Sequence, residues 1–347
     1  MKKVFLVITL IFITNSFAQQ VDEIKVKHEQ FGLKKSAKKM PKKIFIQHFF
    51  VNYQMLFDQI EIAKGGREIG GGHRGDAKAQ LVLGVQGVSE EDLQEVTDKL
   101  YKEYTNRLKA KGFEILTAQE ASKSERFAGW ELVKGGTPSK AQFPGYVSTA
   151  PNGFDFLVRK TTKKGKRKSK KNIFDNGAGV SKDLGVTVAR VHINVPFMKD
   201  GESQGSKALT KSFGGVAKVV GKPEFGILKQ TTIMTKAFIG EKANFITTES
   251  NFVYKKSLKY QASIKTIPKK KILIKDVFEK KKHKAVKSAS QDLWGTGYGA
   301  VRVFNASDVV KKKMQAIPVD ADKYKNGVLT AGKGFLNESL NEFLKHF

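Results

Sequence analysis

The fold of this chain is decided by the stretch Ile44-Phe45-Ile46-Gln47-His48-Phe49-Phe50-Val51-Asn52-Tyr53. The run is almost entirely apolar and follows Pro41, which predicts a strand buried on both faces and therefore central in its sheet. A long helix and the short segment Phe113-Glu114-Ile115-Leu116 come next. We therefore expect a strand, helix, strand unit, and an α+β fold in which a mixed β-sheet carries packed helices.

The helix is predicted from Ser89 to Lys111 by signals at both of its ends. Ser89 is the expected N-cap, and Asp92 three residues later completes a near capping box. Gly112 is expected to end the helix. One apolar stripe recurs between these ends at steps of three and four residues: Leu93, Val96, Leu100, Tyr101, Tyr104 and Leu108.

The segment between strand and helix, Asp58 to Gly87, is rich in glycine and predicts a long mobile loop, within which Leu81-Val82-Leu83 can form a short strand or a turn of helix. It contains Gly70-Gly71-Gly72-His73-Arg74-Gly75, which matches the dinucleotide fingerprint G-x-G-x-x-G. That fingerprint requires a strand running directly into the turn, whereas the predicted strand ends at Tyr53. The pattern therefore favours a loop, and we expect no cofactor.

The rest of the chain predicts mostly strands, with helices toward its end. Expected strands are 154–159, 186–197, 213–220, 227–239 and a hairpin over 245–267 that turns near Lys255 and Lys256; expected helices are 118–130, 277–293 and 335–347. We divide the chain into a signal peptide (1–18), a basic leader (19–43), an α/β subdomain (44–135) and a β-rich subdomain with C-terminal helices (154–347). The last two can also form one continuous domain.

The N-terminus reads as a secretory signal peptide. Lys2 and Lys3 precede an apolar segment and the small-residue end Ser16-Phe17-Ala18, so cleavage is expected before Gln19. The chain contains no cysteine, which excludes disulfides, thiolate metal sites and a lipid-anchored lipoprotein. No later segment reaches the length of a transmembrane span. We expect an exported protein, soluble in the periplasm or outside the cell.

The net charge of +30 predicts attraction to anionic partners, such as lipopolysaccharide, acidic polysaccharide or anionic lipid. Lysine outnumbers arginine heavily, which opposes specific phosphate recognition and favours a solvated surface; we expect no specific nucleic acid. The leader is one lysine-rich segment, with Lys25, Lys27, Lys34, Lys35, Lys38, Lys39, Lys42 and Lys43. The candidate anion-binding or partner-binding residues are Arg67, His73, Arg74, Lys255, Lys256 and Lys259. For the hairpin lysines, the alternative is a solvated turn above core aromatics.

Catalytic patterns are weak. Gly201-Glu202-Ser203-Gln204-Gly205 matches the nucleophile motif G-x-S-x-G, but Lys199 and Asp200 separate it from the strand that should lead directly into it. A triad would need Asp276 or Asp292 with His283 or His346. The six histidines are scattered without metal-ligand spacing, so we assign no catalytic residue and no metal site.

The segment from Lys43 to Thr117 resembles the periplasmic α/β domains of the TolB N-terminal and curli-secretion-channel families. The similarity lies in Lys43-Ile44-Phe45-Ile46, the glycine-rich segment, the long helix and Gly112-Phe113-Glu114-Ile115-Leu116. The resemblance implies an envelope-associated role in assembly or binding, without catalytic residues. The leading hypothesis is an exported, non-catalytic envelope protein that binds an anionic surface or a protein partner. The alternatives are a secreted hydrolase, of serine or carboxylate type, and a structural surface or matrix component.

Overall fold

A seven-stranded mixed sheet forms the centre of the protein. The computed structural model describes residues 21–67, 73–168, 177–201, 216–236, 241–288 and 314–347. The strands follow the order β1, β20, β19, β13, β2, β7, and β9 also pairs with β2. Their bounds are β1 Val26–Phe31, β20 Gln261–Pro268, β19 Glu249–Lys255, β13 Thr187–Val195, β2 Lys43–Gln54, β7 Glu114–Leu116 and β9 Tyr146–Thr149. Parallel and antiparallel pairs occur together and helices pack on the sheet, so the fold is α+β, as the sequence predicts.

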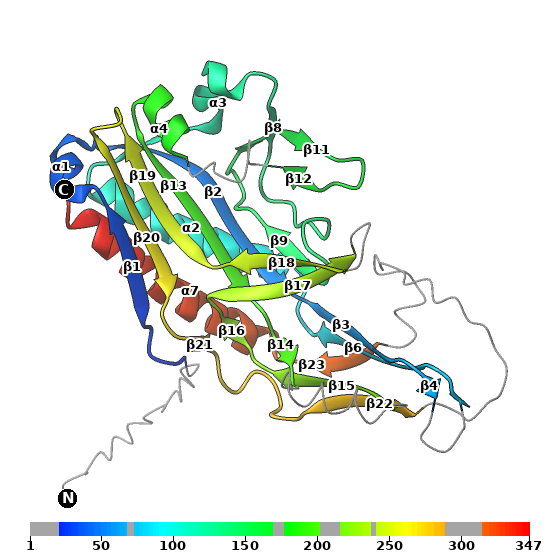
Figure 1. Cartoon of the computed structure of the whole chain (residues 1–347). Coiled ribbons are helices and arrows are strands. Elements are labelled where there is room, and N and C mark those ends of the chain that lie inside the picture. The colour runs from blue at the N-terminus through cyan, green and yellow to red at the C-terminus, as the bar shows by residue number, and fades with distance from the viewer. Residues whose placement is uncertain (1–20, 68–72, 169–176, 202–215, 237–240, 289–313) are drawn as a thin grey trace, which may run out of the picture.

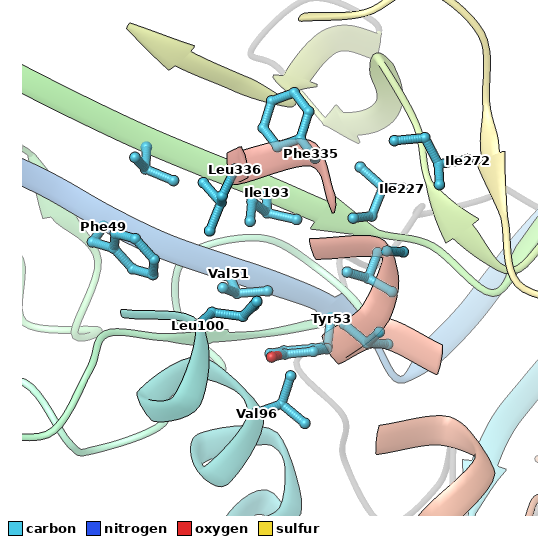
Figure 2. Close-up of a cluster of buried hydrophobic side chains, with 14 of the residues drawn as sticks. Phe49, Val51, Tyr53, Val96, Leu100, Ile193, Ile227, Ile272, Phe335 and Leu336 are labelled. Carbon is cyan, nitrogen blue, oxygen red and sulfur yellow. The ribbon is translucent and has the colours of Figure 1, made fainter. Parts of the chain in front are cut away.

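Strand β2 occupies the central place that its apolar run predicts. It is parallel to β13 on one side and to β7 on the other; α2 directly precedes β7, but further strands lie between β2 and α2 in the chain, so the expected strand, helix, strand unit is interrupted. Two long helices, α2 Glu90–Ala110 and α7 Ala321–Leu344, cover one face of the sheet (Figure 1). There Phe49, Val51 and Tyr53 of β2 pack with Leu100 and Phe335 from the helices in the main core (Figure 2).

The opposite face of the sheet carries a smaller core, to which α3 Ala118–Ala121, η2 Glu125–Phe127, β10 Phe156–Val158 and α4 Ala178–Leu184 contribute. Further short strands are β8 Glu131–Val133, β11 Lys160–Thr161, β12 Arg167–Lys168, β17 Gln230–Lys236 and β18 Glu241–Thr247. Val186, just before β13, and Val188 within it belong to the smaller core with Phe45, whereas Val191 and Ile193 belong to the main core. Because side chains alternate along a strand, Val188 and Val191 point to opposite faces, and β13 contributes to both cores.

The chain between β2 and α2 builds an arm of paired strands instead of a loop. One sheet consists of β3 Leu56–Ala63, β6 Ala77–Gln86 and β23 Gln315–Pro318, and a second of β14 Met198–Asp200, β15 Val216–Pro223 and β22 His283–Ser288. Smaller pairs are β4 Gly66–Arg67 with β5 His73–Arg74, and β16 Gly226–Ile227 with β21 Ile272–Leu273. The two larger sheets pack together, since a Cβ at Gly221 would lie 3.3 Å from Phe57, Leu81 and Leu83.

The arm corrects two sequence predictions. The long loop predicted from Asp58 to Gly87 is wrong, because most of that segment pairs in β3 and β6; the strand alternative at Leu81-Val82-Leu83 is confirmed as part of β6. The buried positions of β6 include the small residues Ala77 and Ala79, which obscure the alternation that identifies a strand. The helix predicted over 277–293 is also wrong, because 283–288 form β22 against β15. Tertiary pairing overrides the helix propensity of its lysines.

Other boundaries shift without changing the type of element. Thr117 caps a helix as predicted, but α3 ends at Ala121 and a 3₁₀ turn follows. The C-terminal helix begins much earlier than 335, because Asp320 caps it by accepting hydrogen bonds from the amides of Asp322 and Lys323. The leader contributes β1 to the sheet, followed by α1 Leu33–Ser36 and η1 Ala37–Lys39.

Candidate functional site

Three of the predicted binding residues lie in the turn between β19 and β20. The hairpin forms where the sequence predicts it, with Lys255 paired to Gln261 at its end. The Lys256 amide donates to the Tyr260 carbonyl at 2.9 Å and closes the turn. Lys256 and Lys259 are exposed, while Lys255 is half-buried. The hairpin therefore holds these lysines at one end of the central sheet.

The other three predicted residues belong to a different part of the molecule. Arg67 pairs with His73 in the β4–β5 ladder, and Arg74 follows His73. This ladder lies at the end of the arm, on the opposite side of the molecule from the β19–β20 turn (Figure 1). The six predicted residues thus form two separate groups, one at each end of the molecule (Figure 1).

The neighbours of the hairpin are the lysines of α1 and η1, which belong to the predicted basic leader. The Ser36 hydroxyl donates to the Gln261 carbonyl at 3.2 Å, and this contact fixes α1 beside the hairpin. Gly32 precedes α1 with φ 67°, and a side chain there would collide with the same carbonyl. Only glycine combines this backbone conformation with such a close approach.

We name the resulting surface the basic corner. It consists of seven lysines from the two segments: Lys34, Lys35, Lys38, Lys39, Lys255, Lys256 and Lys259. Lys39 joins the segments directly, because its Nζ lies 3.4 Å from the centre of the Tyr260 ring. The Lys39 ammonium also lowers the pKa of the Tyr260 phenol.

The basic corner lacks compensating negative charge. No Asp or Glu occurs from Phe31 to Phe57 or from Ser250 to Lys275. Among the described residues, no carboxylate forms an ion pair with any of the seven lysines. Lysines on the helices differ: Lys99 pairs with Glu95 and Lys333 with Glu103. Because like charges gather without partners, the corner is a region of positive potential.

Two exposed apolar side chains, Leu258 and Phe31, lie beside these lysines. Leu258 is 91% exposed, in the turn between Lys256 and Lys259. Phe31, the last residue of β1, is 62% exposed, and only Gly32 separates it from α1. A single exposed leucine is common on protein surfaces. The position of Leu258 among lysines that have no described carboxylate partner makes this turn amphipathic.

A second polar feature is buried in the central sheet. We name it the polar ladder: Gln47, His48 and Asn52 of β2 with Arg190, His192 and Asn194 of β13. Arg190 Nε donates to Gln47 Oε1 at 2.9 Å, His48 Nδ1 lies 3.2 Å from His192 Nε2, and Asn52 Nδ2 donates to Asn194 Oδ1 at 2.9 Å.

A β-bulge shapes this ladder. The register shifts between Ala189 and Arg190, which face Ile46 and His48, so Gln47 is the extra residue of β2. The bulge lets adjacent residues Gln47 and His48 both reach partners on β13, which strict alternation would prevent. The feature of the sequence that could have indicated this ladder is a set of polar residues within otherwise apolar strands. Cross-strand hydrogen bonds of this kind specify the register of buried strands.

The remaining predicted chemistry is not assembled in the described structure. Ser203 and Asp292 lie outside the described residues, so the serine hydrolase triad stays a prediction. Among the described residues, no group of three His, Asp or Glu gathers closely enough to share a metal ion. None of the described helices combines the length and apolar character needed to cross a bilayer.

Comparison of the chain with models of protein families, with curated proteins and with solved structures found no match. Its function must therefore be argued from its own residues.

Proposed function

We propose that this protein is an exported, non-catalytic protein that binds an anionic surface through the basic corner. A single observation carries the proposal: seven lysines from two distant segments converge where no described carboxylate pairs with them. Folding has concentrated charge that a merely soluble surface would disperse among acidic residues.

The type of side chain favours an extended surface over one small ligand. Lysine carries a compact ammonium on a flexible stem and lacks the planar fork by which arginine grips a single phosphate or carboxylate. All seven basic groups of the corner are lysines. Several mobile point charges suit a surface that presents repeated phosphate or carboxylate groups, such as lipopolysaccharide, acidic polysaccharide or anionic lipid.

The proposed location comes from the N-terminal sequence. Residues 1–18 have the pattern of a signal peptide, and lie outside the described residues. The resemblance of Lys43 to Thr117 to periplasmic α/β domains is consistent with the same location. We therefore place the binding at the cell envelope, where anionic polysaccharides and lipid headgroups are abundant.

The test compares two sets of lysine substitutions in the full chain without its predicted signal peptide. The first variant carries Lys255→Gln, Lys256→Gln and Lys259→Gln. Since each lysine near an anionic membrane surface strengthens binding about fivefold, this variant should bind phosphatidylglycerol vesicles about 100-fold more weakly. Binding is measured by vesicle sedimentation at low and at high salt, and high salt should weaken it by screening.

The control variant carries Lys163→Gln, Lys164→Gln and Lys166→Gln in the β11–β12 hairpin. These lysines are also exposed around a hairpin turn, and their removal changes the net charge equally. The control should bind nearly as well as the unchanged protein. Equal losses in both variants would mean that overall charge rather than the basic corner drives binding, and would overturn the proposal.

A further inference from the structure

We propose that the basic corner docks on a lipid bilayer containing anionic phospholipid, with Leu258 inserted between the headgroups. This inference rests on the proposed function and names its partner. A soluble polyanion and a bilayer both offer phosphate to lysine, but only the bilayer offers an apolar interior. The deciding feature is therefore the exposed Leu258, which lies between Lys256 and Lys259 in the turn.

The turn presents Leu258 in a fixed geometry. Backbone hydrogen bonds join Lys256 and Tyr260, and a six-pair antiparallel register continues below them. The Lys255 amide also donates to the Ser181 hydroxyl of α4 at 2.8 Å. Since this turn is anchored to its surroundings, inserting Leu258 requires little additional ordering of the backbone.

The side chains beside Leu258 suit the boundary between water and lipid. Lys256 and Lys259 flank it in sequence, and both are exposed. Lysine at such a boundary places its apolar stem along the lipid and its ammonium among the phosphates. Tyr260, half-buried beneath Lys39, adds the kind of amphipathic ring that is enriched at membrane interfaces.

A bilayer accounts for the composition of the corner better than a protein partner does. A protein interface usually buries a cluster of aromatic and arginine anchors at its centre. Here the exposed apolar side chains are Leu258 and the neighbouring Phe31, and the basic groups are all lysine. Shallow insertion of one apolar group combined with several lysine–phosphate attractions is the usual balance of peripheral membrane binding.

The expected contribution of Leu258 is large enough to measure. Complete burial of a leucine side chain corresponds to a change in affinity of about one to two orders of magnitude. Leu258→Ser should therefore weaken binding to phosphatidylglycerol-containing vesicles at least about tenfold. Its binding to soluble inorganic polyphosphate should not change, because polyphosphate offers the leucine no apolar environment.

Leu132→Ser is the matched control. Leu132 is 44% exposed on β8, away from the basic corner, so its substitution should leave vesicle binding unchanged. A direct measurement of insertion uses the absence of cysteine from the chain. Leu258→Cys labelled with an environment-sensitive dye should show a blue shift on phosphatidylglycerol vesicles, whereas labelled Leu132→Cys should not.

The outcomes separate this inference from the proposed function. If Leu258→Ser binds vesicles as tightly as the unchanged protein and the dye does not shift, insertion is wrong, although binding through the lysines stands. The same conclusion follows if the unchanged protein binds polyphosphate but no vesicles. If it binds neither probe, the proposed function itself fails.

Discussion

Replacing Asn52 by leucine tests the energetic role of the polar ladder. Asn52 and Asn194 face each other in the β2–β13 register, and their side chains are 2% and 0% exposed. Their single hydrogen bond leaves Asn52 Oδ1 and Asn194 Nδ2 without a described partner. In Asn52→Leu, the Asn194 amide loses its remaining side-chain hydrogen bond and stays buried.

The expected magnitude follows from this count of polar atoms. An amide left buried without its hydrogen bond costs about 1–3 kcal/mol, so Asn52→Leu should lower the free energy of unfolding by about 2 kcal/mol. Asn194→Leu should have a similar effect for the same reason. The double variant removes both amides together, and replacement of both partners by apolar groups of similar shape is nearly neutral.

Urea unfolding of the four proteins, followed by circular dichroism, measures these values as a double-mutant cycle. We expect the double variant to be more stable than either single variant, with a coupling free energy of about 1 kcal/mol or more. Asn106→Leu, at an exposed position of α2, is the surface control and should change stability by less than about 0.5 kcal/mol. Additive losses in the double variant would refute the pairing argument.

Two further predictions concern the helices. Phe343→Ala should lower the free energy of unfolding by about 3–5 kcal/mol in urea titrations, because the fully buried Phe343 ring stacks on the Phe252 ring with their centres 3.9 Å apart. Phe245→Ala, at an exposed phenylalanine, is the control. Equal losses of stability in the two variants would contradict the assigned packing. Asp92→Asn should lower the free energy of unfolding by about 1 kcal/mol at neutral pH, because the Ser89 amide donates a hydrogen bond to the Asp92 carboxylate and lowers its pKa. Because the pKa of this carboxyl is lowered in the folded protein, its contribution to stability is complete above the unfolded carboxyl pKa of about 4 and declines below it. The difference in unfolding free energy between Asp92→Asn and the unchanged protein should therefore vanish in acid. A stability difference that persists in acid would contradict the role of the ionised carboxylate.

The basic corner shows how far a sequence can locate a site. Lys255, Lys256 and Lys259 were predicted because they lie together in a recognisable hairpin turn. Lys34 and Lys39 were noted only as part of a basic leader, since nothing local indicates that this segment packs beside the turn. Their juxtaposition depends on hydrogen bonds and ring contacts between segments more than two hundred positions apart.

The arm and the C-terminal region show where local patterns mislead. In β6, small residues such as Ala77 and Ala79 fill buried positions, so the segment lacks the alternating large side chains of a typical strand. Residues 283–288 have the lysine content of a solvated helix, yet pairing with β15 makes them a strand. In both segments the partner strand supplies hydrogen bonds that local propensity cannot predict.

The sequence by itself determined the α+β class, the central place of the 44–53 strand, both ends of the helix that follows Ser89, and the β19–β20 hairpin. These features rest on interactions between residues a few positions apart, such as the reciprocal hydrogen bonds of Ser89 and Asp92, or on the hydrophobic pattern of one segment. Only the tertiary structure decided the polar ladder and the basic corner. The Asn52–Asn194 and Ser36–Gln261 hydrogen bonds join residues 142 and 225 positions apart, and such contacts form only when strand register and packing bring the segments together.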